Sequence, residues 1–177
     1  MQEARPYTEY NLDTVQIEER AMTVIESALA ADVGHEIGSR LQHLLVEFTD
    51  LSLQAKQVHW HVTGPTFESI HLQMDRLVAD ARIWADTVAE RAVTLGSTVD
   101  GNAATVAAGS KLQPMTLGYL PSAAAVGEIT RRVRQVAVEV RTEVQALGDL
   151  DPVTQDVVIG IAEALDKHLW MLQAQLS

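Results

Sequence analysis

Four side chains that can bind a metal ion share one face of the segment from residue 66 to 95. His71, Asp75, Asp86 and Glu90 are separated by four, eleven and four residues. At 100° per residue in an α-helix they fall within an arc of about 100°. His71 and Asp86 nevertheless lie about 22 Å apart along the axis, at a rise of about 1.5 Å per residue. Since they cannot bind one ion within one subunit, the spacing predicts two half-sites.

A two-fold axis near the middle of this segment would complete both half-sites. It would place His71 and Asp75 of one chain opposite Asp86 and Glu90 of an antiparallel copy. His59, which precedes the break between this segment and the one before it, can add a second imidazole. Two imidazoles and three carboxylates suit iron, manganese or zinc, and the absence of cysteine excludes a thiolate site. The ligand types alone do not single out iron.

Two alternatives apply to the same residues. A conventional di-iron centre within one bundle needs Glu-x-x-His pairs from two helices. Glu68 and His71 form one such pair, and the later helical segments contain none. The simpler alternative makes each side chain a surface or packing residue, which is the usual role of a single His or Asp on a helix. The joint spacing favours a metal site over this alternative.

Periodic apolar side chains predict the four long helices that must position these ligands. The predicted helices cover residues 35–62, 66–95, 121–147 and 152–176, each with apolar residues spaced three and four apart. Gly64 with Pro65, Gly96 and Gly148 end the first three, and Pro152 begins the fourth. The expected fold is an all-α, ferritin-like four-helix bundle.

Two regions outside these helices have weaker patterns. Residues 97–120 lack a sustained period and predict a long crossover between the second and third helices, with a short helix near residues 103–108. Such a crossover allows the third helix to run parallel to the second. Residues 1–34 predict an N-terminal arm and an extra short helix from Thr14 to about Ala31, outside a single bundle domain of residues 35–177.

The charge of the chain argues against polyanionic partners. It has 13 Lys+Arg against 24 Asp+Glu, a net charge of -11, and residues 1–36 alone carry -6. Without a basic tail there is no source of counterion release, so we expect weak or absent DNA binding. The chain also lacks a signal pattern and an apolar run of about 18 residues. We therefore expect a soluble, cytoplasmic protein that does not associate with membranes.

Four motifs occur in a specific order along the chain: KQVHWHVTGPTF, HLQMD, AERAVTLG and LDKHLWML. Together they resemble the Dps family, the mini-ferritins named as DNA-binding proteins from starved cells, over about residues 35–177. The resemblance implies a hollow dodecamer built from two-fold dimers. It also implies that Fe(II) is bound, oxidised preferably by hydrogen peroxide rather than O2, and stored as ferric mineral. Such a protein is a ferroxidase that protects against oxidative damage.

The resemblance assigns residues to this function. The ferroxidase ligands would be His59, His71 and Asp75 of one subunit with Asp86 and Glu90 of its two-fold mate, which is the division that the helix length requires.

Trp60 and three aspartates have further roles by the same resemblance. Trp60 would take up stray oxidising equivalents beside the site, with aromatic packing as the alternative. Asp149, Asp151 and Asp156 would line three-fold pores that admit Fe(II), with compensation of the helix N-terminus as the alternative.

The other four histidines receive no ligand role. His61 stands where the family commonly has Asn, and it points to a different helix face from His59. His35, His43 and His168 are predicted to be surface or packing residues. Two other functions are compatible with parts of the sequence: a DNA-compacting protein with little catalysis, which the charge disfavours, and a di-metal hydrolase that uses the same interface.

Overall fold

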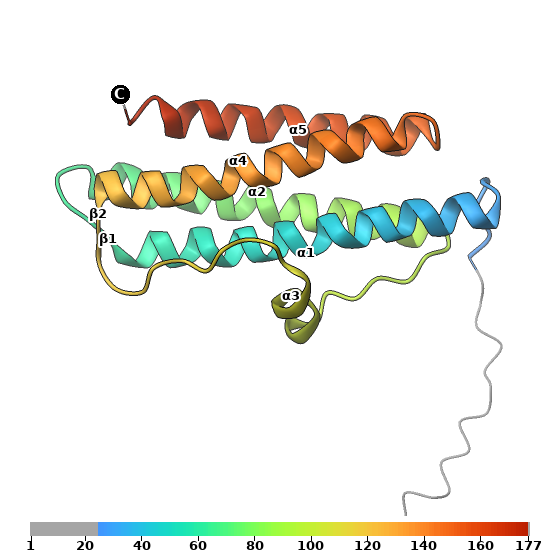
Figure 1. The fold of residues 1–177 in the computed structure, drawn as a ribbon, viewed down its shortest axis with the longest axis horizontal. Coiled ribbons are helices and arrows are strands. Elements are labelled where there is room, and N and C mark those ends of the chain that lie inside the picture. The colour runs from blue at the N-terminus through green and yellow to red at the C-terminus, as the bar shows by residue number, and fades with distance from the viewer. Residues whose placement is uncertain (1–24, 177) are drawn as a thin grey trace, which may run out of the picture.

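The structure is a computed structural model that describes residues 25–176 (Figure 1). Four long helices lie side by side: α1 (Ala31–His61), α2 (Phe67–Thr94), α4 (Ser122–Leu147) and α5 (Pro152–Gln173). The predicted ferritin-like four-helix bundle is confirmed. In the part of the chain that the structure describes, no helix is long and apolar enough to cross a membrane.

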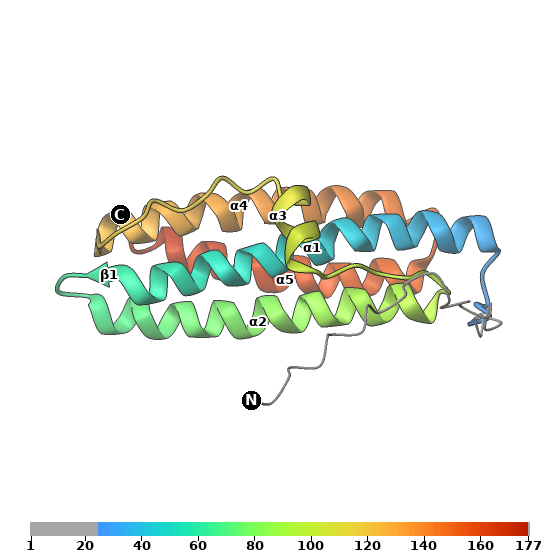
Figure 2. The same cartoon turned by 90° about the horizontal axis from the view of Figure 1, so that it is seen from below.

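The connections set the direction of each helix. A tight turn joins α1 to α2, and Gly64 adopts φ +111° there, a conformation that favours glycine. The crossover from α2 to α4 carries the short helix α3 (Ala103–Gly109) and runs along the side of α1 and α4 (Figure 2). As predicted, α4 runs parallel to α2 (Figure 1).

Two short strands lie at the end of the bundle where α1 meets α2. β1 (Val62–Thr63) follows α1, and β2 (Leu120–Pro121) precedes α4. They pair in parallel, with Val62 opposite Leu120. The pairing fixes the end of the crossover beside the α1–α2 turn, close to where the predicted ligands His59 and His71 are found.

The core consists of the predicted apolar stripes of all four helices. Its largest fully buried side chains include Leu44, Phe48, Met74, Leu77, Ile129 and Leu165. Phe48 packs edge-on against Trp84, with the ring centroids 5.7 Å apart. Each large apolar side chain contributes about 1.5–3 kcal/mol when it is removed from water, so burial of these stripes fixes which face of each helix remains outside.

The C-terminal end of the predicted N-terminal helix is not helical in the structure. Residues 25–30 are not helical, and α1 begins at Ala31 and continues through Gly34. A Cβ at Gly34 would lie 2.9 Å from the carbonyl oxygen of Leu95, so glycine permits close packing there and does not break the helix. The rest of the predicted helix, residues 14–24, lies outside the described residues.

Candidate metal centre

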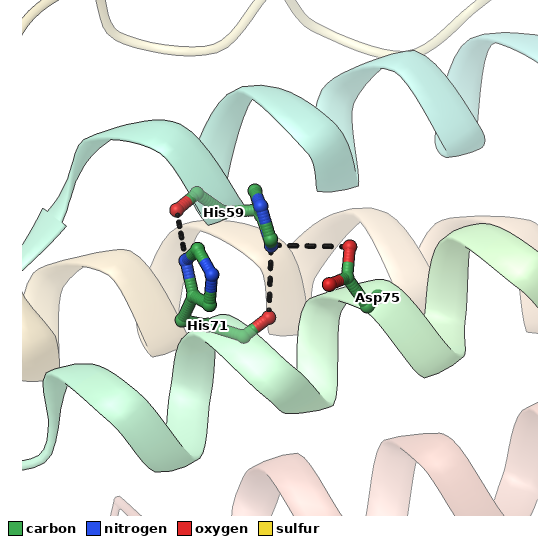
Figure 3. A group of neighbouring side chains, drawn as sticks. All are labelled: His59, His71 and Asp75. Carbon is green, nitrogen blue, oxygen red and sulfur yellow. Dashed lines mark hydrogen bonds and ion pairs between the residues drawn. The ribbon is translucent and has the colours of Figure 1, made fainter.

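Three of the predicted ligands converge where α1 ends and α2 begins (Figure 3). His59 comes from the last turn of α1, and His71 and Asp75 lie one turn apart on α2. One ligand atom from each of the three lies within 4.8 Å of the others. The short turn between the helices brings these residues together, because it places the end of α1 directly against the first turns of α2.

The two imidazoles hold each other in a fixed orientation. His59 Nδ1 lies 3.0 Å from the carbonyl oxygen of His71, and His71 Nδ1 lies 2.9 Å from the carbonyl oxygen of His59. The rings are stacked with their centroids 3.6 Å apart. A carbonyl oxygen only accepts hydrogen bonds, so each Nδ1 must carry the proton. Each Nε2 is then left with the lone pair that a metal ion requires.

Asp75 supplies a carboxylate that is ionised at neutral pH. The hydrogen bond from Lys56 lowers the pKa of Asp75, and slight burial only partly opposes this lowering. Lys56 Nζ lies 2.6 Å and His59 Nδ1 3.1 Å from Asp75 Oδ1. A cation bound here must therefore compete with the ammonium group of Lys56.

Sequence reasoning did not assign a role to Lys56. Its position three residues before His59 was the available signal, because residues at that spacing occupy the same face of a helix. The contact with Asp75 also required knowledge of how α1 and α2 pack together.

Asp86 and Glu90 lie apart from the ligand group within this chain. Both are exposed on α2, on the same face as His71, as the axial spacing predicts. Two large apolar side chains on this face are also exposed: Leu72 is 48% and Ile83 is 61% accessible. An exposed face that combines apolar residues with unused carboxylates is typical of a surface that contacts another protein chain.

Trp60 and the three predicted pore residues have distinct environments. Trp60, next to His59, is 61% exposed, so most of its indole makes no contact with the part of the chain that the structure describes. Asp151 is buried and is the N-cap of α5, where it accepts hydrogen bonds from the Thr154 backbone and from Arg91. This contact fits the alternative of compensation at a helix N-terminus.

The other two aspartates, Asp149 and Asp156, are exposed. Their carboxylates are accessible to ions in solution, in contrast to that of Asp151, which is held by the helix cap and by Arg91.

The remaining histidines lie away from this centre. His61 Nδ1 lies 2.9 Å from the carbonyl oxygen of Gln57 in its own helix. His168 is buried, with Nε2 2.7 Å from Asp80 Oδ2, which agrees with a packing role. His43 Nε2 lies 2.9 Å from Glu139 Oε2, a contact that the prediction of a surface or packing role did not include. Glu139 is far away in the sequence, so helix periodicity could not reveal this contact.

The four-helix bundle has the fold of ferritin-like proteins, and the ferritin-like domain family matches residues 39–177. The DNA protection during starvation protein of Mycolicibacterium smegmatis is 32% identical over 141 residues, covering 80% of this chain and 77% of the relative. Protein 2 of the same name from Deinococcus radiodurans is 30% identical over 136 residues. This match covers 77% of the chain and 56% of the relative. The chain therefore belongs to the Dps family of ferritin-like proteins.

Solved Dps structures have the same fold. The tetragonal form of Mycobacterium smegmatis Dps superposes with a TM-score of 0.82 at 31% identity, covering 85% of this chain and 91% of that one. Dps from Microbacterium arborescens in the high iron form gives 0.81 at 30% identity, covering 85% and 98%. This family and fold support iron storage and ferroxidase chemistry in general.

Proposed function

We propose that the protein is a ferroxidase that oxidises Fe(II) at sites shared by two subunits and stores the ferric product inside a hollow dodecamer. One observation carries this proposal. His59, His71 and Asp75 converge at one end of α2, while Asp86 and Glu90 are exposed on the same face of the helix, about 22 Å further along. In an antiparallel two-fold dimer, the first set of each chain would lie beside the second set of the other chain, which makes two complete sites.

The exposed face of α2 favours such a mate. Pairing two copies would remove Leu72 and Ile83 from water and would place Asp86 and Glu90 beside the imidazoles of the other chain. The exposed indole of Trp60 would lie at the margin of the completed site. We assign it the uptake of oxidising equivalents that escape the main reaction.

The ligand set suits iron as a substrate in both oxidation states. Imidazole nitrogen and carboxylate oxygen both bind Fe(II), and three carboxylates favour the more highly charged Fe(III) product. The preferred oxidant in this proposal is hydrogen peroxide. Two Fe(II) ions supply the two electrons that, with two protons, convert one peroxide to two water molecules. Because the electrons are delivered as a pair, hydroxyl radical is not released.

The distribution of charged side chains indicates where Fe(II) enters and how strongly the protein binds DNA. We assign Asp149 and Asp156 to the pores that admit Fe(II), since their exposed carboxylates can attract cations. Asp151 is less suited, because its carboxylate is already held by Arg91 and the cap of α5. The net charge of -11 supports weak or absent DNA binding. Tight retention in a gel shift at about 150 mM salt would contradict this part of the proposal.

Mixed oligomers test the shared site directly. The protein is loaded with Fe(II) without oxygen, peroxide is added, and ferric absorbance is followed in wild type, His71→Ala, Asp86→Ala and a co-assembled mixture of both variants. Each variant alone loses activity at every site. In a heterodimer of the two, one site carries both substitutions and the other carries neither. Random pairing at equal amounts therefore restores about one quarter of the wild-type sites.

The matched control is Glu68→Gln, which also removes an exposed carboxylate from α2. It keeps full activity if the site is shared, and it loses activity if Glu68 and His71 form half of a di-iron centre within one chain. No recovery of activity in the mixed oligomers would refute shared ligation.

A further inference from the structure

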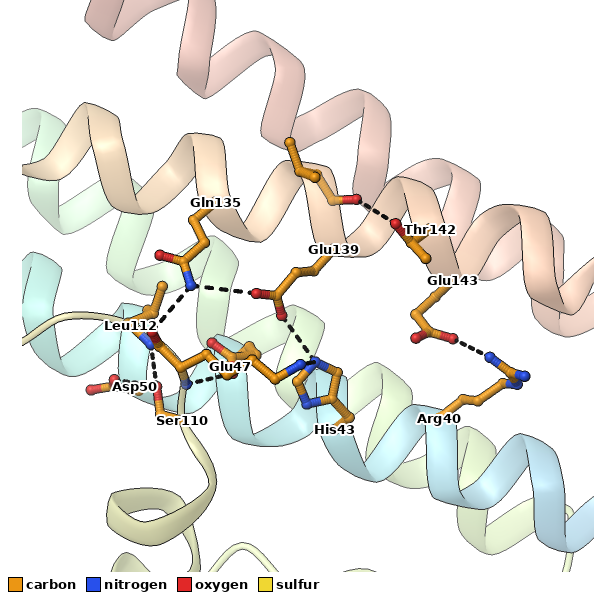
Figure 4. A network of polar contacts seen from close by, with 12 residues as sticks. Arg40, His43, Glu47, Asp50, Ser110, Leu112, Gln135, Glu139, Thr142 and Glu143 are labelled. Atoms are coloured by element: carbon orange, nitrogen blue, oxygen red, sulfur yellow. Dashed lines mark hydrogen bonds and ion pairs between the residues drawn. The ribbon is translucent and has the colours of Figure 1, made fainter.

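A second group of potential metal ligands lies where the crossover after α3 covers α1 and α4 (Figure 4). His43 and Glu47 are one turn apart on α1, and Glu139 comes from α4. One ligand atom from each of the three lies within 4.8 Å of the others. Glu47 and His59 are twelve residues apart on the same helix, or about 18 Å, so this group is separate from the centre at the α1–α2 turn.

Glu47 is a buried acid with an unused ligand atom. The residue is 0% exposed, and its Oε1 accepts a hydrogen bond of 2.9 Å from the backbone N–H of Lys111. Its Oε2 is buried and has no hydrogen-bond partner within the described residues. An unsatisfied buried polar atom costs about 1–3 kcal/mol, and more if the group is charged. The geometry leaves Oε2 available to a cation between α1 and α4.

Glu139 presents one oxygen to the same space. Its Oε2 lies 2.9 Å from His43 Nε2, while its Oε1 lies 3.4 Å from Gln135 Nε2. The same Gln135 nitrogen donates to the carbonyl oxygen of Lys111 at 3.1 Å. Gln135 therefore binds Oε1 of Glu139 and leaves Oε2 directed at His43. Residues that hydrogen-bond to a metal ligand commonly orient it in this way.

The crossover backbone that closes this group is itself held in place. Ser110 donates a hydrogen bond of 2.6 Å to Asp50 Oδ2, and it accepts one of 3.1 Å from the backbone of Leu112 (Figure 4). These contacts flank Lys111, whose backbone N–H orients Glu47. The position of Glu47 Oε2 is therefore fixed by the fold.

We propose that His43, Glu47 and Glu139 bind a divalent transition-metal ion within each subunit, through His43 Nε2 and the Oε2 atoms of both glutamates. One imidazole and two carboxylates suit Zn(II), Fe(II) or Mn(II), and three protein ligands leave a position for water. The side chains of His43 and Glu139 are 25% and 18% exposed, which provides a route for the ion. The exposed Lys111 ammonium, 3.5 Å from His43 Nε2, moves outward when the ion binds.

The bound ion would link α1 to α4, and Glu47 would connect it to the crossover through the backbone N–H of Lys111. This metal site is distinct from the shared ferroxidase site, because it requires only one chain and uses none of the same residues. The proposal therefore does not depend on iron oxidation.

Equilibrium dialysis of the full-length, metal-free protein against Zn²⁺ tests the site, with bound metal counted per chain. Glu47→Gln and His43→Ala should each bind one ion fewer per chain than their parent. The same loss is expected in a His71→Ala background, where the centre at the α1–α2 turn is already disabled. The matched control is Glu143→Gln, which removes a carboxylate one turn beyond Glu139 that pairs with Arg40 instead. It should bind as many ions as its parent.

Thermal unfolding separates lost binding from lost folding. Gln at position 47 has nearly the same size as Glu and can still accept the Lys111 N–H, so Glu47→Gln should fold without metal. In the His71→Ala background, Zn²⁺ should raise the Tm of the parent and of the Glu143→Gln variant but not the Tm of the Glu47→Gln variant. An unchanged ion count or an unchanged Zn²⁺-dependent rise in Tm in the Glu47→Gln variant would overturn the proposal.

Discussion

Asp151 ties the start of α5 to α2, and its replacement by Asn measures how much this one carboxylate contributes to the bundle. Its Oδ2 accepts hydrogen bonds of 2.9 Å from the Thr154 backbone and 2.7 Å from Arg91. Burial raises the pKa of Asp151, but the hydrogen bonds from Thr154 and Arg91 outweigh burial, and the pKa is lowered from 3.8 to about 2. This difference corresponds to about 2 kcal/mol of stability at neutral pH.

Asn isolates the effect of charge, because it caps helices about as well as Asp. The folded-state pKa lies below the unfolded value, so the stabilisation by Asp151 is fully present above about pH 4 and is lost as the pH falls through about 2. Asp151→Asn should therefore lower the free energy of unfolding by about 2 kcal/mol at pH 7. The difference from wild type should shrink to about half of this value at pH 3.

Urea unfolding followed by circular dichroism measures both values, at one fixed protein concentration because subunit association also contributes to stability. Asp149→Asn, at an exposed position two residues earlier, is the control and should change the free energy by less than about 0.5 kcal/mol. A difference for Asp151→Asn that is equally large at pH 7 and pH 3 would refute the electrostatic origin. A loss of less than about 0.5 kcal/mol at pH 7 would refute the size of the contribution.

Three further substitutions test the candidate centre, the turn and the core. Lys56→Gln should raise the pKa of Asp75 towards its ordinary value and tighten Co²⁺ binding severalfold in dialysis, since an ammonium group no longer competes; weaker binding would contradict this. Gly64→Ala should cost about 1–3 kcal/mol in urea unfolding because φ is +111°, and an unchanged midpoint would show that the turn relaxes. Phe48→Ala should cost about 3–5 kcal/mol by the same measurement; a loss below 1 kcal/mol would mean that the core refills the cavity.

The sequence determined the helices and their buried faces. Apolar residues repeat at the helical period over each long segment, and the turn at Gly64 and the start at Pro152 use residues with strong local preferences. The rise per residue was also sufficient to show that His71 and Asp86 cannot share an ion within one chain. These conclusions depend on local geometry, which is nearly the same in every α-helix.

Only the tertiary structure decided which residues pack against each helix face. A separate helix was predicted to end at about Ala31, with the bundle beginning at residue 35. Instead α1 begins at Ala31 and includes Gly34, where the absence of a side chain lets the carbonyl oxygen of Leu95 pack closely. The contact of Lys56 with Asp75 depends on how α1 and α2 are aligned along their axes.

The group of His43, Glu47 and Glu139 is a further arrangement that the sequence alone could not predict. His43 and Glu139 are 96 residues apart in the sequence and belong to helices joined through α2 and the crossover. Helical periodicity specifies which side of one helix is buried, but it does not specify the neighbouring helix or the axial position at which the two meet. Packing of the whole bundle fixes both, and so it alone could place the carboxylate of Glu139 on α4 beside His43 on α1.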